Sequence, residues 1–156
     1  MSARPAIASE VRIRPTAEAD VAAIAELLGQ LGYPSSVEQV RARLAALAAS
    51  GSNYVLVAET EGQVVGLAAL QIGQQLEKDD RHGQLTALVT GQHVRRKGVA
   101  QALVRAVEEL AREQRCELLF LRSNKRRSDA HAFYRAEGFR ETHLTFNKTL
   151  EKGARP

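Results

Sequence analysis

The sequence predicts an α/β fold in which a mixed central sheet of six to seven strands is covered by about four helices. Segments with alternating or continuous apolar residues, typical of strands, are interspersed with segments whose apolar residues recur every three or four positions, typical of helices. A length of 156 residues suits one domain with its own core. We therefore expect a single domain over residues 10–150, with loose tails at 1–9 and 151–156.

The first predicted elements are a short strand and a helix. Residues 11–14 alternate as a strand, and Thr16 follows as the expected N-cap of the helix. Gly32 is the expected C-terminal cap, and Pro34 prevents the helix from continuing. The apolar stripe of this helix consists of Val21, Ile24, Leu27, Leu28 and Leu31.

A second helix and a hairpin come next. Ser36 and Gln39 form the expected capping box at the start of the helix. Residues 54–59 and 64–72 are typical of strands, and Glu61–Gly62 between them predicts a tight turn. These two strands should therefore pair antiparallel.

A third helix follows a strand and a basic turn. The polar residues 73–83 predict a loop, and residues 84–90 predict the strand. Arg95–Lys97, Gly98 and Ala100 then lead directly into the helix. Its apolar stripe consists of Val99, Leu103, Ala106, Val107 and Leu110.

This basic turn predicts an anion site. A helix start leaves backbone N–H groups unpaired and carries partial positive charge, so a bound pyrophosphate would be stabilised there. Gly98 has no Cβ, which lets a phosphate approach the chain closely. The same residues are also compatible with solvated charge before an ordinary helix.

The C-terminal part predicts a strand, a helix and one or two final strands. Cys116–Leu121 is apolar at successive positions, as in a strand covered on both faces, which favours a central place in the sheet. Ser128 or Asp129 is the expected cap of the last helix, and Gly138 is expected to close it. Residues 139–150 supply the final strands.

The charge and the aromatic content of the chain argue against a nucleic-acid partner. The formal charge of +4, from 22 Lys and Arg against 18 Asp and Glu, does not define a nucleic-acid binder. The chain has no Trp and only 4% aromatic residues, which argues against a surface on which RNA bases stack. We therefore expect no nucleic-acid partner.

The single cysteine and the hydropathy predict a soluble cytoplasmic protein. Cys116 alone cannot form an intramolecular disulfide, and its apolar neighbours are typical of a structural thiol. No apolar stretch approaches the roughly 20 residues that span a bilayer, and residues 1–10 lack the apolar core of a signal peptide. We expect no membrane partner and no metal, and the sequence leaves the oligomeric state open, a homodimer included.

Two motifs occur in a fixed order. Ala87–Val89 leads to Arg95–Ala100, and Asp129–Tyr134 leads to Gly138–Phe139. With these motifs, the order strand, two helices, three strands, helix, strand, helix, strand resembles the GNAT superfamily of acetyl-CoA-dependent N-acetyltransferases over nearly the whole chain. The resemblance implies a GNAT-like fold and an acyltransferase whose acceptor is a primary amine of a small molecule or a peptide.

By this resemblance acetyl-CoA is the co-substrate, and the chain holds it at the first motif. In the family, backbone amides bind the pyrophosphate and the preceding strand pairs with the pantetheine arm. The family's Asn in the first turn of the last helix is replaced here by Arg127, while Asn124 lies three residues earlier. The implied cofactor contacts are Leu88, Val89, Arg95, Arg96, Lys97, Gly98, Val99, Ala100, Asn124 and Arg127.

The resemblance also implies roles in the reaction. The amine attacks the thioester directly, a tetrahedral intermediate forms, and Tyr134 acts as the general acid that protonates the leaving thiolate. A phenol with a pKa near 10 keeps its proton at pH 7. From periodicity alone, Tyr134 is an aromatic residue that packs beside Phe133 and Phe139. Tyr33, in the loop that shapes the acceptor pocket of the family, is implied as a substrate contact, and local packing accounts for it equally well.

The group that deprotonates the amine is not evident. Acidic residues are common in the family on the strand before the pyrophosphate turn, but the matching positions here are Gln84 and Thr86, which cannot serve. This departure supports an alternative function, a non-catalytic sensor of acyl-CoA with the same fold. Other titratable side chains nearby, to none of which we assign the role, are His82, His143, Glu77, Asp79 and Asp80.

Overall fold

A computed structural model describes residues 10–94 and 98–153 of the chain. It consists of two compact units, one that ends at Leu121 and one that begins at Arg122. We call them the N-terminal unit and the C-terminal unit.

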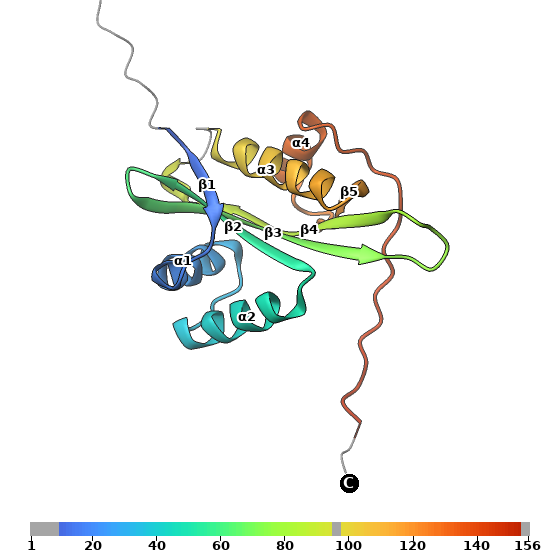
Figure 1. Ribbon diagram of the computed structural model, residues 1–156, viewed down its shortest axis with the longest axis horizontal. Coiled ribbons are helices and arrows are strands. Elements are labelled where there is room, and N and C mark those ends of the chain that lie inside the picture. Colours follow the sequence, from blue (N-terminus) through green and yellow to red (C-terminus); the bar gives the residue numbers. More distant parts are fainter. Residues whose placement is uncertain (1–9, 95–97, 154–156) are drawn as a thin grey trace, which may run out of the picture. The chain divides into compact units, whose positions relative to one another are not determined.

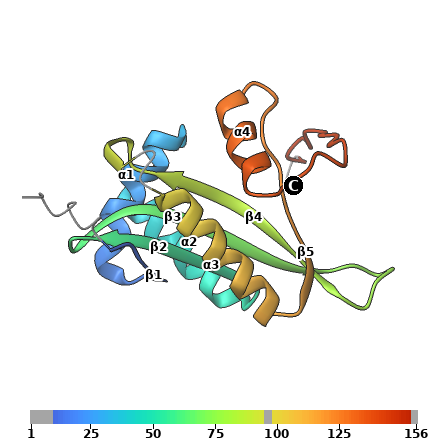
Figure 2. The same ribbon diagram turned by 90° about the horizontal axis from the view of Figure 1, so that it is seen from above.

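The N-terminal unit is built on a mixed five-stranded sheet. Its strands lie side by side in the order of the sequence (Figure 2). The first four pair antiparallel, and the fifth pairs parallel to the fourth. The strands are β1 (Arg12–Pro15), β2 (Asn53–Thr60), β3 (Gln63–Gln74), β4 (Arg81–Thr90) and β5 (Cys116–Leu121).

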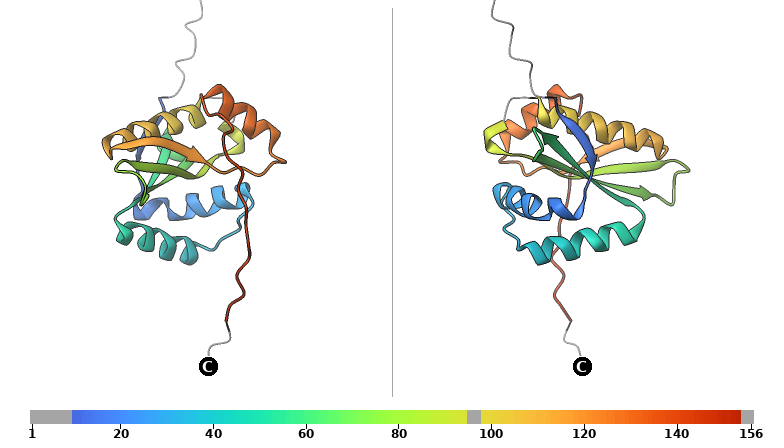
Figure 3. Two further views of the ribbon diagram at one scale, coloured as in Figure 1. Left: turned by 90° about the vertical axis from the view of Figure 1, so that its right-hand side faces the viewer. Right: turned by 60° about the vertical axis from the view of Figure 1, so that its left-hand side comes forward.

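Helices cover both faces of this sheet, as an α/β fold requires. One face carries α3 (Val99–Glu113), and the opposite face carries α1 (Val21–Leu31) and α2 (Val37–Ser50) (Figures 1 and 3). Two short 3₁₀ helices, η1 (Glu18–Asp20) and η2 (Gln92–Val94), precede α1 and follow β4.

The predicted apolar stripes form the core. On one face, the buried side chains of α1 and α2 pack on those of the central strands, and on the other face Val99, Leu103 and Val107 of the predicted α3 stripe are buried while Ala106 and Leu110 are half-buried. The first cluster consists of Val21, Ile24, Leu27, Val40, Val57, Leu67 and Val89. The buried residues of α3 are Val99, Leu103, Val104, Val107 and Ala111.

Most predicted helix ends and turns are confirmed. Gly32 caps α1 in the left-handed conformation, with φ of 104°. Ser36 and Gln39 form the capping box of α2, with N···O distances of 2.9 and 3.1 Å. Glu61 and Gly62, with φ of 51° and 76°, make the turn between β2 and β3. These local signals therefore determine where the elements begin and end.

Two predicted N-caps are wrong. Thr16 does not cap a helix, because η1 intervenes and α1 begins after Asp20. Neither Ser128 nor Asp129 caps α4 (Ser128–Ala136), because both lie inside the helix and Arg127 occupies the cap position. At both sites the backbone enters the helix without a side-chain cap.

The last strands differ most from the prediction. The described residues form five strands, so the six or seven predicted are not confirmed. Residues 139–150 form no strand, and Leu144, Phe146 and Leu150 are 70, 87 and 81% exposed. Strand β5 lies at the edge of the sheet rather than at its centre, and Leu118 is 52% exposed. The expected loop at 73–83 is shorter, because β3 and β4 extend into it.

A buried carboxylate joins the first strand to the first helix. Asp20 accepts hydrogen bonds from the Arg14 guanidinium at 2.7 and 2.9 Å and from the Ala17 N–H at 2.7 Å. Arg14 also donates to Glu59 on β2 at 2.8 Å. The side chain of Asp20 is 5% exposed, so little solvent screens the pair. These bonds fix η1 and the start of α1 to the edge of the sheet.

We predict that Asp20→Asn lowers the free energy of unfolding by about 1–3 kcal/mol, because the variant removes the buried one of the two carboxylates that bind the Arg14 guanidinium and leaves only Glu59. Urea unfolding followed by circular dichroism measures the loss. The matched control is Glu18→Gln, which removes an exposed partner of Arg41 and should cost less than about 0.5 kcal/mol. Equal effects of both substitutions would contradict the assignment.

The same pair should make stability sensitive to acid. Hydrogen bonds from Arg14 lower the pKa of Asp20 below its ordinary value of 3.8, although burial opposes them. A lowered pKa contributes stability at neutral pH, which is lost as the pH falls below the ordinary value toward the folded one. We expect the difference in unfolding free energy between wild type and Asp20→Asn to shrink below about pH 4. A difference that stays constant down to pH 3 would exclude this linkage.

Candidate functional site

Strand β4 loses its neighbour β5 about halfway along its length. Strands β4 and β5 pair in parallel from Arg81 and Cys116 as far as Leu85 and Leu121, where the described pairing ends. Residues 87–90 of β4 therefore pair only with β3, and Thr86 is unpaired at a bulge, within the described part of the chain. Backbone N–H and C=O groups that lack a strand partner are the groups with which an extended ligand pairs.

The open part of β4 leads directly to α3. Gly91 donates its N–H to Val65 on β3 at 2.7 Å, and the Val94 N–H bonds to the Gly91 carbonyl at 3.1 Å. The Gln92 N–H bonds to Oε1 of Gln30 on α1 at 3.2 Å. Three predicted cofactor residues, Arg95, Arg96 and Lys97, lie outside the described residues.

The start of α3 has the features of an anion site. Gly98 adopts the left-handed conformation, with φ of 78°, and no side chain caps the helix. A Cβ placed on Gly98 would meet no atom within 4 Å, so the space above this glycine is open. The first α-helical bond runs from the Ala102 N–H to the Gly98 carbonyl, and the amides before it have no acceptor within the helix. Backbone amides and the helix dipole together favour a bound anion here.

The predicted contacts on β4 and α3 differ in what they expose. The side chain of Val89 is buried in the core beneath α1, and that of Val99 is buried beside Gly66 on β3. Leu88 and Ala100 are half-buried. The side chains of Val89 and Val99 therefore offer no surface to a ligand.

In the C-terminal unit, Tyr134 lies in an aromatic cluster. Its ring makes edge contacts with Phe133 and Phe139, at centroid distances of 5.6 and 5.9 Å. Gly138, with φ of 94°, turns the chain so that the Phe139 N–H bonds to the Tyr134 carbonyl at 3.0 Å. Burial raises the pKa of Tyr134, and the positive charge of Arg127 opposes this shift. The phenol therefore keeps its proton at neutral and mildly alkaline pH.

Asn124 and Arg127 form the turn before α4. The side-chain oxygen of Asn124 accepts the Arg126 N–H at 3.0 Å, and its carbonyl accepts the Arg127 N–H at 3.1 Å. His131 Nε2 lies 2.8 Å from the same carbonyl. Asn124 is thus engaged in holding the turn, while the exposed Arg127 occupies the cap position of the helix.

The side chains near the expected base position are mostly unsuited to that role. Thr86 is the extra residue of a bulge in β4, between the pairs Leu85–Leu70 and Ala87–Ala69, and it donates to the Ala69 carbonyl at 3.3 Å. Gln84 lies opposite Gln71 on β3. His82 packs on Phe120 at a centroid distance of 5.6 Å, and its buried Nδ1 has no hydrogen-bond partner among the described residues.

The remaining titratable candidates are exposed. Glu77, Asp79 and Asp80 lie in the short loop between β3 and β4. His143 bonds through Nδ1 to the Thr142 hydroxyl at 2.7 Å. None of these side chains has a contact that points to proton transfer.

Tyr33 and Cys116 differ in exposure. Tyr33 is 68% exposed in the loop between α1 and α2, and its N–H bonds to the Leu28 carbonyl at 2.8 Å. Cys116 is half-buried at the start of β5, and burial raises the pKa of its thiol although the charge of Arg81 opposes the shift. A thiol of this kind is a poor nucleophile at neutral pH.

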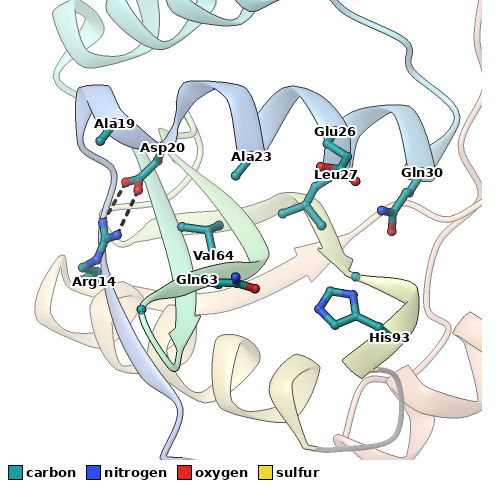
Figure 4. Close-up of a pocket in the computed structure, with 12 residues that line it drawn as sticks. Arg14, Ala19, Asp20, Ala23, Glu26, Leu27, Gln30, Gln63, Val64 and His93 are labelled. Carbon is teal, nitrogen blue, oxygen red and sulfur yellow. Dashed lines mark hydrogen bonds and ion pairs between the residues drawn. The ribbon is translucent and has the colours of Figure 1, made fainter.

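A pocket of about 550 Å³ lies between α1, the β2–β3 turn and η2 (Figure 4). Arg14 and Asp20 lie at one end of it, where they bond to each other, and Gln30 and His93 lie at the other. The sequence analysis did not identify this pocket, because its lining comes from four separate segments. Small side chains line it on this side, Ala19 on η1 and Ala23 on α1.

The structure brings together only part of the predicted site. Leu88 and Val89 lie in β4, and Gly98, Val99 and Ala100 lie at the start of α3, all in the N-terminal unit. Asn124, Arg127 and Tyr134 lie in the C-terminal unit. The sequence analysis missed the open edge at 86–90, since only the observed end of the β4–β5 pairing reveals it.

The described residues contain no cluster of His, Cys, Asp or Glu that could hold a metal ion. None of their helices has both the length and the hydropathy of a membrane span.

Comparison with known proteins places this geometry in a family. A family model described as acetyltransferase (GNAT) family matches residues 21–139. Aminoalkylphosphonate N-acetyltransferase of Salmonella typhimurium is 35% identical over 89 residues, which are 57% of this chain and 58% of that enzyme. The match thus spans little more than half of that relative.

Solved structures share the fold over most of the chain. A protein from Bacillus halodurans, described as a transcriptional regulator, is 26% identical with a TM-score of 0.80, covering 90% of this chain and 100% of its own. An aminoglycoside N-acetyltransferase in complex with CoA is 18% identical with a TM-score of 0.83, covering 96% of this chain and 100% of its own. At 18% identity the likeness shows the fold alone.

We predict that Gly98→Ala lowers the free energy of unfolding by about 1 kcal/mol, because an L side chain is strained at a φ of 78° even where space is open. Gly29→Ala is the matched control, since Gly29 lies inside α1 with open space around it and should gain about 0.5–1 kcal/mol. Thermal unfolding of both variants tests the conformation of the turn. A neutral Gly98→Ala would show that the left-handed conformation is not needed.

Proposed function

Because the chain belongs to the GNAT family of acetyltransferases, we propose that it transfers an acetyl group from acetyl-CoA to a primary amine. The observation that carries this proposal is the open edge of β4 at 86–90, which leads through Gly91–Val94 to the start of α3. This path offers first a row of backbone groups and then a positive helix end.

The chemistry of CoA fits these groups. The amides of its pantetheine arm can pair with the free backbone of β4 as an added strand would. Its pyrophosphate suits the amides at the start of α3, where Gly98 leaves open space. In the proposed complex Leu88 and Val89 contact the arm, and Gly98, Val99 and Ala100 contact the phosphates. The solved CoA complex of a protein with this fold supports the proposal.

The proposed reaction is direct transfer. The acceptor nitrogen, once deprotonated, attacks the thioester carbon, and the C–S bond of the tetrahedral intermediate then breaks. The electron pair of that bond goes to sulfur, and the hydroxyl of Tyr134 donates the proton that neutralises it. The attacking nitrogen releases its surplus proton to solvent, and the Tyr134 phenolate regains a proton from solvent. The raised pKa of Tyr134 supports this role, because the phenol remains protonated over the pH range in which amines begin to lose their protons.

The proposed acceptor is the amine of a small molecule. Two proteins similar to this chain are named for small amine substrates, an aminoalkylphosphonate and an aminoglycoside. The exposed Tyr33 lies in the loop after α1, where it is a proposed acceptor contact. We propose no identity for the acceptor beyond this class.

A second candidate function is a sensor that binds acyl-CoA without transfer. The observation that favours it is the pair Gln84 and Thr86, neither of which can take a proton from an ammonium group. Both candidates share the CoA site and differ only in chemistry. A panel of amines with acetyl-CoA, followed by thiol release, distinguishes them, provided that a thermal shift with CoA shows binding.

We predict that Tyr134→Phe lowers kcat about 10²- to 10⁴-fold while the Kd for CoA changes little, because the variant keeps the ring and removes only the proton donor. Steady-state kinetics and calorimetry measure the two quantities. Tyr54→Phe, on β2, is the control for loss of a phenol elsewhere and should keep wild-type kcat. Unchanged turnover in Tyr134→Phe would remove this residue from the mechanism.

A further inference from the structure

Among the described residues, two long-range hydrogen bonds hold residues 91–94, which follow β4, to the rest of the N-terminal unit. One is made by the backbone, from the Gly91 N–H to the Val65 carbonyl on β3 at 2.7 Å. The other uses a side chain, from the Gln92 N–H to Oε1 of Gln30 at 3.2 Å. A substitution at Gln30 can therefore remove the second bond without changing the backbone of the turn.

The Gln92 N–H requires an acceptor from outside its own helix, and Gln30 supplies it. Gln92 is the first residue of η2, and the first amides of a helix have no acceptor inside the helix. Gln30 lies in the last turn of α1, and Gly32 ends that helix two residues later. Its amide oxygen thus supplies a cap from another element, 62 residues away in the sequence.

Gln30 is linked to both parts of the proposed site, the acceptor contact Tyr33 and the phosphate-binding start of α3. It lies three residues before the exposed Tyr33, and its hydrogen-bond partner lies six residues before Gly98. Figure 4 shows its side chain at the end of α1, at the same end of the pocket as His93 of η2. Across this end of the pocket, the hydrogen bond of Gln30 is the contact that joins α1 to the segment between β4 and α3.

From this arrangement we infer that Gln30 is a positioning residue for CoA binding: it fixes Gln92 in residues 91–94, which precede the proposed phosphate-binding amides of Gly98–Ala100 in the sequence. The inference rests on the proposed function. Gln30 itself contacts neither co-substrate in the proposed complex, and it acts by keeping the segment in the geometry that the anion requires. CoA binding then loses less conformational entropy, because the segment is already ordered before CoA binds.

The test compares Gln30→Met with Gln63→Met. Methionine keeps the length of glutamine and lacks a strong acceptor, so Gln30→Met removes the bond to Gln92. Gln63 is an exposed glutamine that lines the same pocket, and its side chain makes no hydrogen bond among the described residues. Calorimetry with CoA gives the Kd, and amide hydrogen exchange by NMR gives the protection of Gln92.

We expect the Kd for CoA to rise about two- to tenfold in Gln30→Met, the effect of one lost hydrogen bond, and to stay within twofold of wild type in Gln63→Met. The Gln92 amide should exchange faster only in Gln30→Met. Equal CoA affinity of Gln30→Met and wild type, or an equal loss in both variants, overturns the inference. If wild type itself fails to bind CoA, the proposed function fails instead, and the Gln92 exchange still reports whether Gln30 holds the segment.

Discussion

The site depends on the point at which parallel pairing between β4 and β5 stops. Up to Leu85 and Leu121 the two strands satisfy each other's backbone groups, and beyond that point β4 continues with one side unpaired. An unpaired strand edge is a liability unless something covers it, and a ligand that carries amide groups of its own is a suitable cover. The start of α3 follows a few residues later in the sequence, so the same unit presents both strand-like and anion-binding backbone groups.

The rest of the N-terminal unit keeps this path in place. Helix α3 buries its apolar stripe on one face of the sheet, and α1 and α2 bury theirs on the other, so β4 is clamped from both sides. The ion pair of Arg14 and Asp20 fixes the beginning of α1, and Gln30 near its end bonds to η2. Helix α1 is thus bonded to the edge of the sheet at its beginning and to η2 near its end.

The sequence predicts the elements well where local chemistry decides, and less well where distant partners decide. Gly32, Ser36 with Gln39, and Glu61–Gly62 act within a few residues, and all are confirmed. The apolar run at 116–121 is typical of a central strand, but pairing on one side only cannot be deduced from its composition. The alternation at Leu144 and Phe146 likewise predicts a strand, yet a strand also requires a neighbour to pair with. For the same reason the open edge of β4 could not be predicted, whereas the glycine and helix that follow it could.

The distribution of charge limits how the N-terminal unit can bind an anion. Residues 1–121 contain 13 Lys and Arg against 14 Asp and Glu, whereas residues 122–156 contain nine against four. The surplus positive charge of the chain is therefore concentrated after β5, and no net positive field of the N-terminal unit draws a polyphosphate to α3. Binding there has to come from short-range groups, namely backbone amides, the helix dipole and the adjacent basic residues. A site of this kind depends on exact placement of the backbone, which is why the hydrogen bonds that hold residues 91–94 matter more than the total charge.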